Sequence, residues 1–327
     1  MPDLSVTYMG LKLRNPVIAA SSSLSKSLDG VKRLADTGVG AIVLKSMFEE
    51  QIMAETEQVA SHAQSAWHSE AMEYVQNMGM DLGPRDYLRV IEEAKKAVDT
   101  PIIASLNCFS TRWWADYAKK LEVAGADAIE LNVSFVISDP RVGCSQVEDQ
   151  YVSILEKVND RVELPVAMKI GPMFSSPANI AYRLAGSGAA ALVLFNRYYR
   201  FDIDLDKMGL VAGNPFSTPD ELHLPLRWIG LLAGRIDCDM SATTGIHDWP
   251  DAVKMILVGA TTVQVCSALY REGLGRATQI IDGISNWMKE KNYPSLEDLC
   301  GKLSQLRSAD PDRFERLQYI KTFVGIE

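Results

Sequence analysis

The sequence lacks any run of 18 uninterrupted apolar residues, so it offers no candidate for a membrane-spanning helix. Its first residues, MPDLSVTYMGLKLRNP, lack the basic stretch followed by an apolar stretch that marks a secretory signal, and we therefore expect a cytosolic protein. It has no strongly basic run, and its net charge of −9 would repel a phosphate backbone. Membrane and nucleic-acid partners are therefore not expected.

Cysteine and histidine are scarce and scattered. The five cysteines are odd in number and form no CxxC pair, which argues against a disulfide framework or a zinc site, so we interpret them as buried, reduced thiols. The four histidines show no metal-ligand spacing, and we interpret them as surface or loop residues with no metal site. The residues concerned are Cys108, Cys144, Cys238, Cys266, Cys300, His62, His68, His223 and His247.

Short runs of apolar and β-branched residues recur along the chain, each bounded by Gly, Pro or Asp. Each run is continuously apolar, as expected for a parallel strand that is buried on both faces. Segments with helical periodicity lie between the runs, and several of them end in Gly. The eight predicted strands are 16–20, 40–45, 101–106, 127–132, 165–170, 189–195, 237–245 and 261–266.

Eight strands that alternate with helices predict a (β/α)8 TIM barrel, which makes 1–327 a single domain. A doubly wound open sheet is the alternative, but no GxGxxG motif follows the first strand. Two connections, 46–83 and 197–224, are longer than a turn between strand and helix requires, and both leave the C-terminal face of the strands. We predict that they form active-site loops and that 291–327 forms a C-terminal helical tail.

Polar residues close the predicted strands where the active site of a barrel lies. Two lysines and several asparagines would meet at one mouth, and a buried ammonium is costly unless an anion or an electron-rich ring lies against it. The convergence therefore predicts a binding site. The strand-end residues are Ala20, Ser21, Lys45, Ser46, Asn107, Asn132, Lys169, Asn196, Thr243, Thr244, Gly245, Cys266 and Ser267.

The last two strands end in small residues, Thr243-Thr244-Gly245 and Cys266-Ser267. Backbone N–H groups of such loops can surround a phosphate closely because no bulky side chain intervenes. Gly245 could equally be an ordinary turn residue. The pairing of the two loops nevertheless favours a cofactor that carries phosphate.

Several motifs together resemble one family. In their order and spacing they are similar to motifs of the class 1 dihydroorotate dehydrogenases, which are flavin mononucleotide (FMN) barrels. The motifs are LRNPVIAASS, GAIVLKS, NMGM, IELNVS, PVAMKI, LFN and TTGI followed by GATTVQVCSAL. The resemblance spans about residues 4–305. It implies a cytosolic, homodimeric enzyme of pyrimidine biosynthesis that oxidises dihydroorotate by hydride transfer to flavin N5.

The resemblance also implies a set of site residues. The FMN phosphate would bind at Gly245 and Ser267, and Lys169 would stabilise the negative charge of the reduced ring. Lys45 would lie between the flavin and an anionic substrate. The remaining flavin contacts would be Ala20, Ser21, Ser46, Asn107, Asn132, Thr243, Thr244 and Cys266, and the remaining substrate contacts Asn77, Met78, Gly79, Asn132 and Asn196.

The loop after the fourth strand departs from the family pattern. Phe135 stands where the family has a Cys or Ser that removes the substrate proton, and Ile137 replaces a substrate-binding Asn. A phenyl ring cannot accept a proton. Ser134, Ser138 and Cys144 are the candidate replacements near this position.

Three hypotheses remain open at this point. The first is an FMN oxidoreductase that acts on dihydroorotate or on a similar planar anion. The second is a flavin-binding barrel that has another substrate or does not turn over. The third is a lyase or aldolase barrel in which Lys169 forms a Schiff base.

Overall fold

A computed structural model describes residues 2–51, 84–107, 113–198, 200–315 and 320. Eight parallel strands form a closed barrel, and hydrogen bonding between the second and third strands, with Ile42 beside Ile102, completes the ring. The predicted barrel is therefore confirmed. Its strands are β3 (Val17–Ala19), β4 (Ala41–Val43), β6 (Ile102–Asn107), β7 (Ala128–Asn132), β8 (Val166–Ile170), β9 (Ala191–Leu194), β12 (Asp239–Thr243) and β13 (Thr262–Val265).

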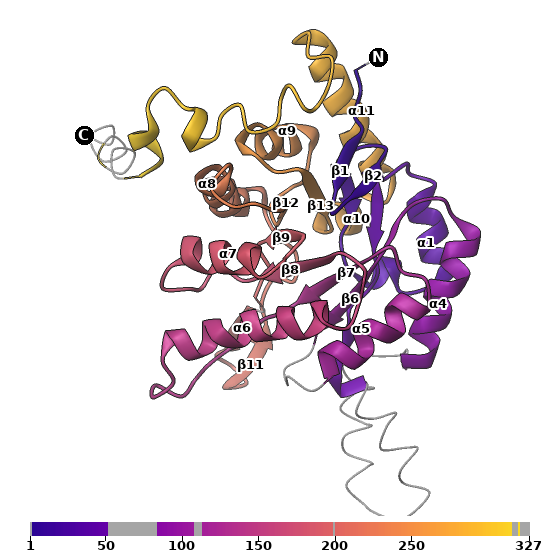
Figure 1. Ribbon diagram of the computed structural model, residues 1–327, viewed down its shortest axis with the longest axis vertical. Helices are drawn as coiled ribbons and strands as arrows, with labels where there is room; N and C mark the ends of the chain where they lie inside the picture. Colours follow the sequence, from indigo (N-terminus) through magenta and orange to yellow (C-terminus); the bar gives the residue numbers. More distant parts are fainter. Residues whose placement is uncertain (1, 52–83, 108–112, 199, 316–319, 321–327) are drawn as a thin grey trace, which may run out of the picture.

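Helices surround the strands in chain order (Figure 1). Their apolar faces pack against the outward side chains of the strands and form the larger of two cores. The helices are α1 (Leu28–Ala35), α4 (Pro84–Ala97), α5 (Trp113–Val123), α6 (Cys144–Asn159), α7 (Pro177–Gly186), α8 (His223–Leu232), α9 (Trp249–Val258), α10 (Ser267–Glu272) and α11 (Gly275–Glu290).

A second, smaller core fills the inside of the barrel. Strand residues alternate between the two cores, so that Ile18 points inward while its neighbours Val17 and Ala19 point outward. Alanines are frequent on the inner surface, where the side chains of opposing strands meet. A hairpin of β1 (Val6–Tyr8) and β2 (Leu11–Leu13) contributes Tyr8 and Leu13 to this inner core.

Asp239 fastens that hairpin to the barrel. Its Oδ2 accepts a hydrogen bond from the backbone N–H of Met9 at 2.7 Å, and its Oδ1 accepts one from the hydroxyl of Thr261 at 3.0 Å. Asp239 is the first residue of β12, so the hairpin closes the N-terminal end of the barrel. The predicted binding site belongs to the opposite, C-terminal end of the strands.

The long connection after β9 contains a second hairpin, β10 (Phe201–Asp204) with β11 (Gly209–Ala212), followed by the 3-10 helix η2 (Pro219–Leu222). In Figure 1 β11 lies in the lower part of the view, whereas β1 and β2 lie at the upper right. After β4, the short strand β5 (Met47–Phe48) pairs with the end of β6, and residues 52–83 lie outside the described part. Beyond α11, the described residues contain the 3-10 helices η3 (Gln305–Arg307) and η4 (Pro311–Phe314).

Candidate active site

The C-terminal ends of the strands enclose a cavity of about 220 Å³. Its wall is completed by Phe195, Arg197, Pro215 and Ser217, which belong to β9's exit and to the long connection that follows it. Many of the predicted cofactor residues lie together here. They are Ala20, Ser21, Lys169, Thr243, Thr244, Gly245, Cys266 and Ser267, with the predicted substrate residue Asn196 beside them.

The other predicted residues lie outside the lining of this cavity. Lys45 and Ser46 follow β4, and Asn107 and Asn132 end β6 and β7. Ser134 is half-buried just beyond β7. Asn77, Met78 and Gly79 lie outside the described residues.

Lys169 belongs to a buried set of three side chains inside the barrel. Its Nζ lies 3.4 Å from Glu130 Oε1 and donates a hydrogen bond to Gln264 Oε1 at 3.3 Å. Gln264 Nε2 donates in turn to Glu130 Oε2 at 2.6 Å. Both partners are at most 2% exposed, because alternation along β7 and β13 turns them into the barrel.

This arrangement places one fixed positive charge on the cavity surface. Glu130 Oε1 accepts no hydrogen bond although it is buried, so the carboxylate depends on the ammonium of Lys169 for compensation. An ammonium has three donors, and Gln264 and Glu130 engage Lys169 from within the barrel. The side that lines the cavity is available to an electron-rich ligand.

Three asparagines at or just beyond the ends of β6, β7 and β9 are linked by hydrogen bonds. Asn196 Nδ2 donates to Asn132 Oδ1 at 2.7 Å, and Asn107 Nδ2 donates to the backbone carbonyl of Asn132 at 3.1 Å. Asn132 pairs with Lys169 in the register of β7 and β8. The pair Asn132 and Asn196 therefore presents an amide donor and an amide acceptor within reach of each other, as a planar ring with carbonyl and N–H groups requires.

A chain of hydroxyls joins the first three strands. Ser46 N–H donates to Ser21 Oγ at 2.9 Å, and the Ser46 and Ser105 hydroxyl oxygens are 2.8 Å apart. Ser105 N–H donates to the buried hydroxyl of Tyr87 from α4. Ser46 is thus held beneath the cavity wall by its neighbours on both sides.

At the opposite end of the cavity the backbone turns sharply at Thr244 and Gly245, which have φ angles of 76° and 82°. A Cβ at Gly245 would lie 2.2 Å from the backbone nitrogen of Leu222, so only glycine fits here. Thr244 Oγ1 donates to the carbonyl of Phe195 at 3.0 Å, which fixes the turn against the exit of β9. The two loops predicted to hold phosphate therefore lie side by side.

Ser217 joins the long connection to this end of the cavity. Its N–H donates to Ser267 Oγ at 2.9 Å, and its Oγ lies 3.1 Å from His247 Nε2. His247 lies in the loop before α9, in line with its interpretation as a surface or loop residue, but it is only 7% exposed and therefore buried. Burial, together with the nearby cation Arg271, lowers the pKa of His247. The sequence gives no sign of this contact, because Ser217 is 30 residues away.

The two site cysteines differ in environment. Burial raises the pKa of the Cys266 thiol, although the ammonium of Lys169 and a hydrogen bond with Ser22 act in the other direction. Cys266 is therefore a neutral lining group. Cys144, by contrast, is exposed at the first residue of α6, so the expectation of a buried thiol was wrong for Cys144, while Cys238, Cys266 and Cys300 are half-buried and Cys108 lies outside the described residues.

Phe135 belongs to an aromatic cluster beyond β7. Its ring meets Tyr151 edge to face at a centroid distance of 5.2 Å, and Tyr151 meets Phe174 in the same way. The backbone N–H of Phe135 donates to the Tyr151 hydroxyl at 3.3 Å. Phe135 therefore has a packing role, and its loop presents Ser134 as the adjacent polar side chain.

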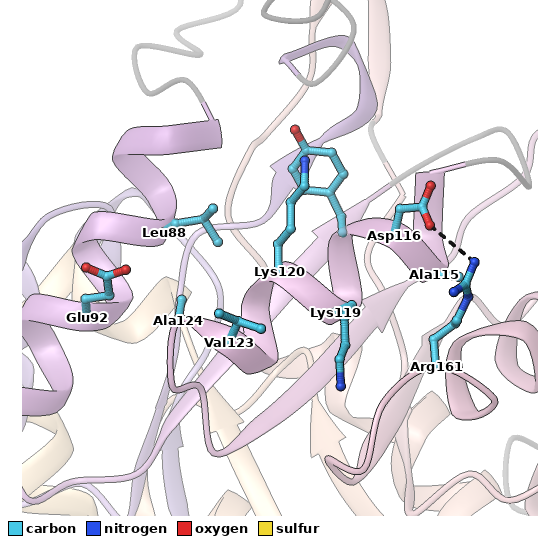
Figure 2. Close-up of a pocket in the computed structure, with 10 residues that line it drawn as sticks. Leu88, Glu92, Ala115, Asp116, Lys119, Lys120, Val123, Ala124 and Arg161 are labelled. Carbon is cyan, nitrogen blue, oxygen red and sulfur yellow. Dashed lines mark ion pairs between the residues drawn. The ribbon is translucent and has the colours of Figure 1, made fainter.

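A larger hollow of about 500 Å³ lies on the outside of the barrel, between α4 and α5 (Figure 2). Its charged residues are engaged locally, since Arg161 lies 3.8 Å from Asp116 and Lys119 pairs with Glu122. Leu88 and Val123 supply the apolar part. Charged groups that pair with neighbours do not converge on a common point, so the smaller cavity at the barrel mouth is the better candidate for catalysis.

Within the described ranges, no group of three or more His, Cys, Asp or Glu side chains could hold a metal ion. No helix of the described residues is long and apolar enough to cross a membrane.

Comparison with known proteins decides the family. The family model for dihydroorotate dehydrogenase matches residues 3–288. The chain belongs to the dihydroorotate dehydrogenase family. Among its relatives is the catalytic subunit of dihydroorotate dehydrogenase B (NAD(+)) of Thermoplasma volcanium, 28% identical over 92% of this chain and 98% of the relative. The proteins of the same name from Pyrococcus abyssi and Methanosarcina mazei are each 28% identical over 91% of this chain, and over 98% and 94% of their own lengths.

Membership makes the chain an oxidoreductase of the dihydroorotate dehydrogenase family. The cavity residues fit the flavin that the family implies. Lys169 supplies a cation for an electron-rich ring, Ala20 and Ser21 leave room beside it, and Ser267 offers a hydroxyl next to the tight turn at Gly245. The Lys169 ammonium also lies 3.4 Å from the buried Oε1 of Glu130, which accepts no hydrogen bond.

Proposed function

We propose that the protein binds FMN in the cavity at the barrel mouth and oxidises dihydroorotate, or a closely related planar anion, in pyrimidine biosynthesis. The observation that carries the proposal is the buried set of Lys169, Glu130 and Gln264 on the cavity floor in a member of the dihydroorotate dehydrogenase family. Bound FMN would supply a hydride acceptor at its N5 atom. The other tasks fall to side chains of this chain.

Lys169 would stabilise the negative charge of a reduced flavin ring, because its ammonium is already in place before reaction. Asn132 and Asn196 would orient the substrate through their linked amides. Lys45, half-buried after β4, would attract the substrate's carboxylate. Gly245 and Ser267 would hold the phosphate, with Thr243, Thr244 and Cys266 lining the same end of the cavity.

Proton removal is the step in which this chain departs from its family. Phe135 is fixed in an aromatic cluster and cannot accept a proton. We assign the role to Ser134 before Cys144, because Ser134 lies two residues beyond Asn132 at the end of β7, whereas Cys144 is exposed at the start of α6. A hydroxyl needs an acceptor for its proton, and water at the mouth would provide one.

The ion pair bears on the alternatives. A lysine that forms a Schiff base needs a free amine to attack a carbonyl, whereas Lys169 Nζ is engaged by Gln264 at 3.3 Å and by Glu130 at 3.4 Å. The lyase hypothesis is therefore disfavoured. This argument does not apply to a flavin-binding barrel without turnover, which the anaerobic spectrum described below distinguishes from an enzyme.

We further propose a cytoplasmic homodimer. The relatives named above are catalytic subunits of an NAD(+)-dependent enzyme. By analogy, electrons would leave this chain through another protein rather than at a membrane.

The test is an absorbance spectrum of the purified protein, followed anaerobically after addition of dihydroorotate. We expect a flavin spectrum that bleaches with dihydroorotate, and slower bleaching in Ser134→Ala than in Cys144→Ala. A flavin spectrum that dihydroorotate leaves unchanged would contradict the assigned substrate and favour the flavin-binding alternative. A colourless protein that FMN cannot reconstitute would contradict the cofactor assignment itself.

A further inference from the structure

Residues 214–217, which we call the strap, contribute to the cavity wall beside Ser267 and are held in place by several contacts. Arg197 Nη1 donates to the carbonyls of the first two strap residues at 2.9 and 3.2 Å. The ring of Phe216 packs against that of Tyr270 from α10 at a centroid distance of 5.4 Å. The position of the strap is therefore fixed before any ligand enters.

Ser217 places a hydroxyl between the cavity and His247. Among the described residues, the cavity lining includes Ser217 but not His247, and the two side chains meet with Ser217 Oγ 3.1 Å from His247 Nε2. Both residues are at most 7% exposed. The imidazole therefore reaches a ligand in the cavity through the hydroxyl of Ser217.

The direction of this hydrogen bond depends on the proton of the imidazole. When Nε2 is unprotonated, it accepts the single hydroxyl proton of Ser217, and only oxygen lone pairs face the cavity. When Nε2 carries a proton, it donates to Ser217 Oγ, and the hydroxyl proton is available to a ligand. An anion at this end of the cavity therefore favours a protonated Nε2.

We propose that His247 is a positioning residue for the phosphate of the flavin. Its Nε2–H donates to Ser217 Oγ, and the Ser217 hydroxyl donates to a phosphate oxygen beside Ser267. This role, which rests on the proposed function, extends the phosphate site to a pair of residues outside the two strand-end loops. A dianionic phosphate nearby favours the charged form of an imidazole, so FMN binding takes up a proton from solvent.

The charges around His247 agree with this coupling. In the ligand-free protein, burial and then Arg271 lower the pKa of His247, whereas Asp251 and Glu272 act in the opposite direction. Both carboxylates have other partners, since Asp251 Oδ2 accepts the backbone N–H of His247 at 3.1 Å and Glu272 lies 3.2 Å from Arg276. A bound phosphate would therefore add negative charge where the protonated imidazole needs it.

The strap carries no charged side chain, so the groups that face the imidazole come from the helices. They are Asp248 and Asp251 at the start of α9, Arg271 and Glu272 of α10, and Arg276 of α11, which donates to the His247 carbonyl and lies 3.3 Å from Asp248.

The experiment titrates the flavin-free protein with FMN and with riboflavin, which lacks the phosphate, at pH 8.0 and pH 6.5. The wild type is compared with His247→Gln and with the matched control His223→Gln, at an exposed position in α8. We expect the wild type and the control to bind FMN at least about threefold more tightly at pH 6.5, because the phosphate raises the pKa of His247. His247→Gln should lack this gain, and riboflavin binding should be independent of pH in all three proteins.

The phosphate itself has a second pKa of about 6, below this window, and it acts on all three proteins alike. Calorimetry in two buffers of different ionisation enthalpy measures the proton uptake directly. It should accompany FMN binding in the wild type and be smaller in His247→Gln. FMN binding with the same pH dependence and proton uptake in His247→Gln and the wild type would overturn the role of His247 and leave the proposed function in place.

Ser217→Ala provides a second test that does not depend on the folding of His247→Gln. Loss of the hydroxyl should weaken FMN binding by about tenfold and leave riboflavin binding unchanged, because a hydrogen bond to a charged group is lost. FMN binding as tight as in the wild type would contradict the proposed hydrogen bond. A wild type that binds neither flavin would instead overturn the proposed function, and this role with it.

Discussion

At the scale of single residues, Lys169 compensates a buried carboxylate and also lines the cavity that we propose for flavin. Its ammonium compensates Glu130, whose Oε1 is buried without a hydrogen bond. A buried carboxylate that loses its partner is far more costly than a pair that is removed together. The residue can therefore be tested by stability as well as by activity.

Lys169→Met should lower the free energy of unfolding by about 3 kcal/mol, because it leaves Glu130 buried and uncompensated. Adding Glu130→Gln to the same chain should restore a large part of this loss, while flavin binding stays weak in both variants. Urea unfolding and FMN titration measure the two effects. Equal unfolding free energies for Lys169→Met and the wild type would show that Glu130 is compensated in another way.

His247 predicts a pH dependence. Its pKa is lowered in the folded state from the ordinary value of 6.5, first by burial and then by Arg271. Below pH 6.5 the unfolded chain therefore binds more protons than the folded chain, so stability rises with pH in this window and is lost as the pH falls. His247→Gln should lose less stability between pH 7.5 and pH 5.5 than the wild type does.

Urea unfolding at the two pH values tests this expectation. His223→Gln is the matched control, because His223 is exposed at the start of α8. The same loss of stability in His247→Gln and in the wild type would mean that other titratable groups cause the destabilisation at low pH.

The chemistry of several residues could be read from the sequence, and that of others could not. Lys169 stood out because it closes an apolar strand. The roles of Glu130 and Gln264 could not be predicted, because the two residues are 134 positions apart in the sequence. No local sequence pattern indicates a contact over such a separation. The burial of the loop residue His247 against Ser217 could not be predicted for the same reason.

At the scale of elements, the tight turn after β12 determines the shape of the cavity. Gly245→Ala would place a Cβ 2.2 Å from the backbone of Leu222 at a φ of 82°. We expect a loss of about 2 kcal/mol in unfolding free energy and weaker FMN binding, because the turn or η2 must shift. Gly186→Ala in α7, where a Cβ meets nothing within 4 Å, should be neutral or stabilising.

Thermal unfolding and FMN titration of these two glycine variants provide the measurement. If Gly245→Ala bound FMN as tightly as Gly186→Ala, the turn would not be part of the binding site.

The strands of the barrel were predictable because burial on both faces leaves continuous apolar runs. The hairpin at 201–212 was predicted only as a loop, although FDID followed by GLVA shows the alternation of an exposed strand. Its apolar residues point to solvent in the single chain, so the usual rule that places apolar residues inside gave no guidance.

At the scale of the whole molecule, the two ends of the barrel have separate roles. Asp239 fastens the closing hairpin at the N-terminal end, and the cavity lies at the other end. Asp239→Ala should therefore cost about 1–3 kcal/mol of stability, because it leaves the Met9 N–H unpaired, and should leave FMN affinity unchanged. Chemical unfolding and flavin titration separate the two quantities, and weakened FMN binding in the folded variant would contradict this division.

The seam between β3 and β13 has a consequence for how the protein is made. Val17 pairs with Val263, and Ala20 and Ser21 share the cavity with Cys266 and Ser267, so the pocket joins the beginning of the chain to a stretch near its end. On the ribosome the first strand must wait for some 240 residues before its neighbour exists, and contacts of such long sequence separation form slowly. Flavin capture would then mark a chain whose synthesis has passed the last strand, and unfinished chains would remain colourless.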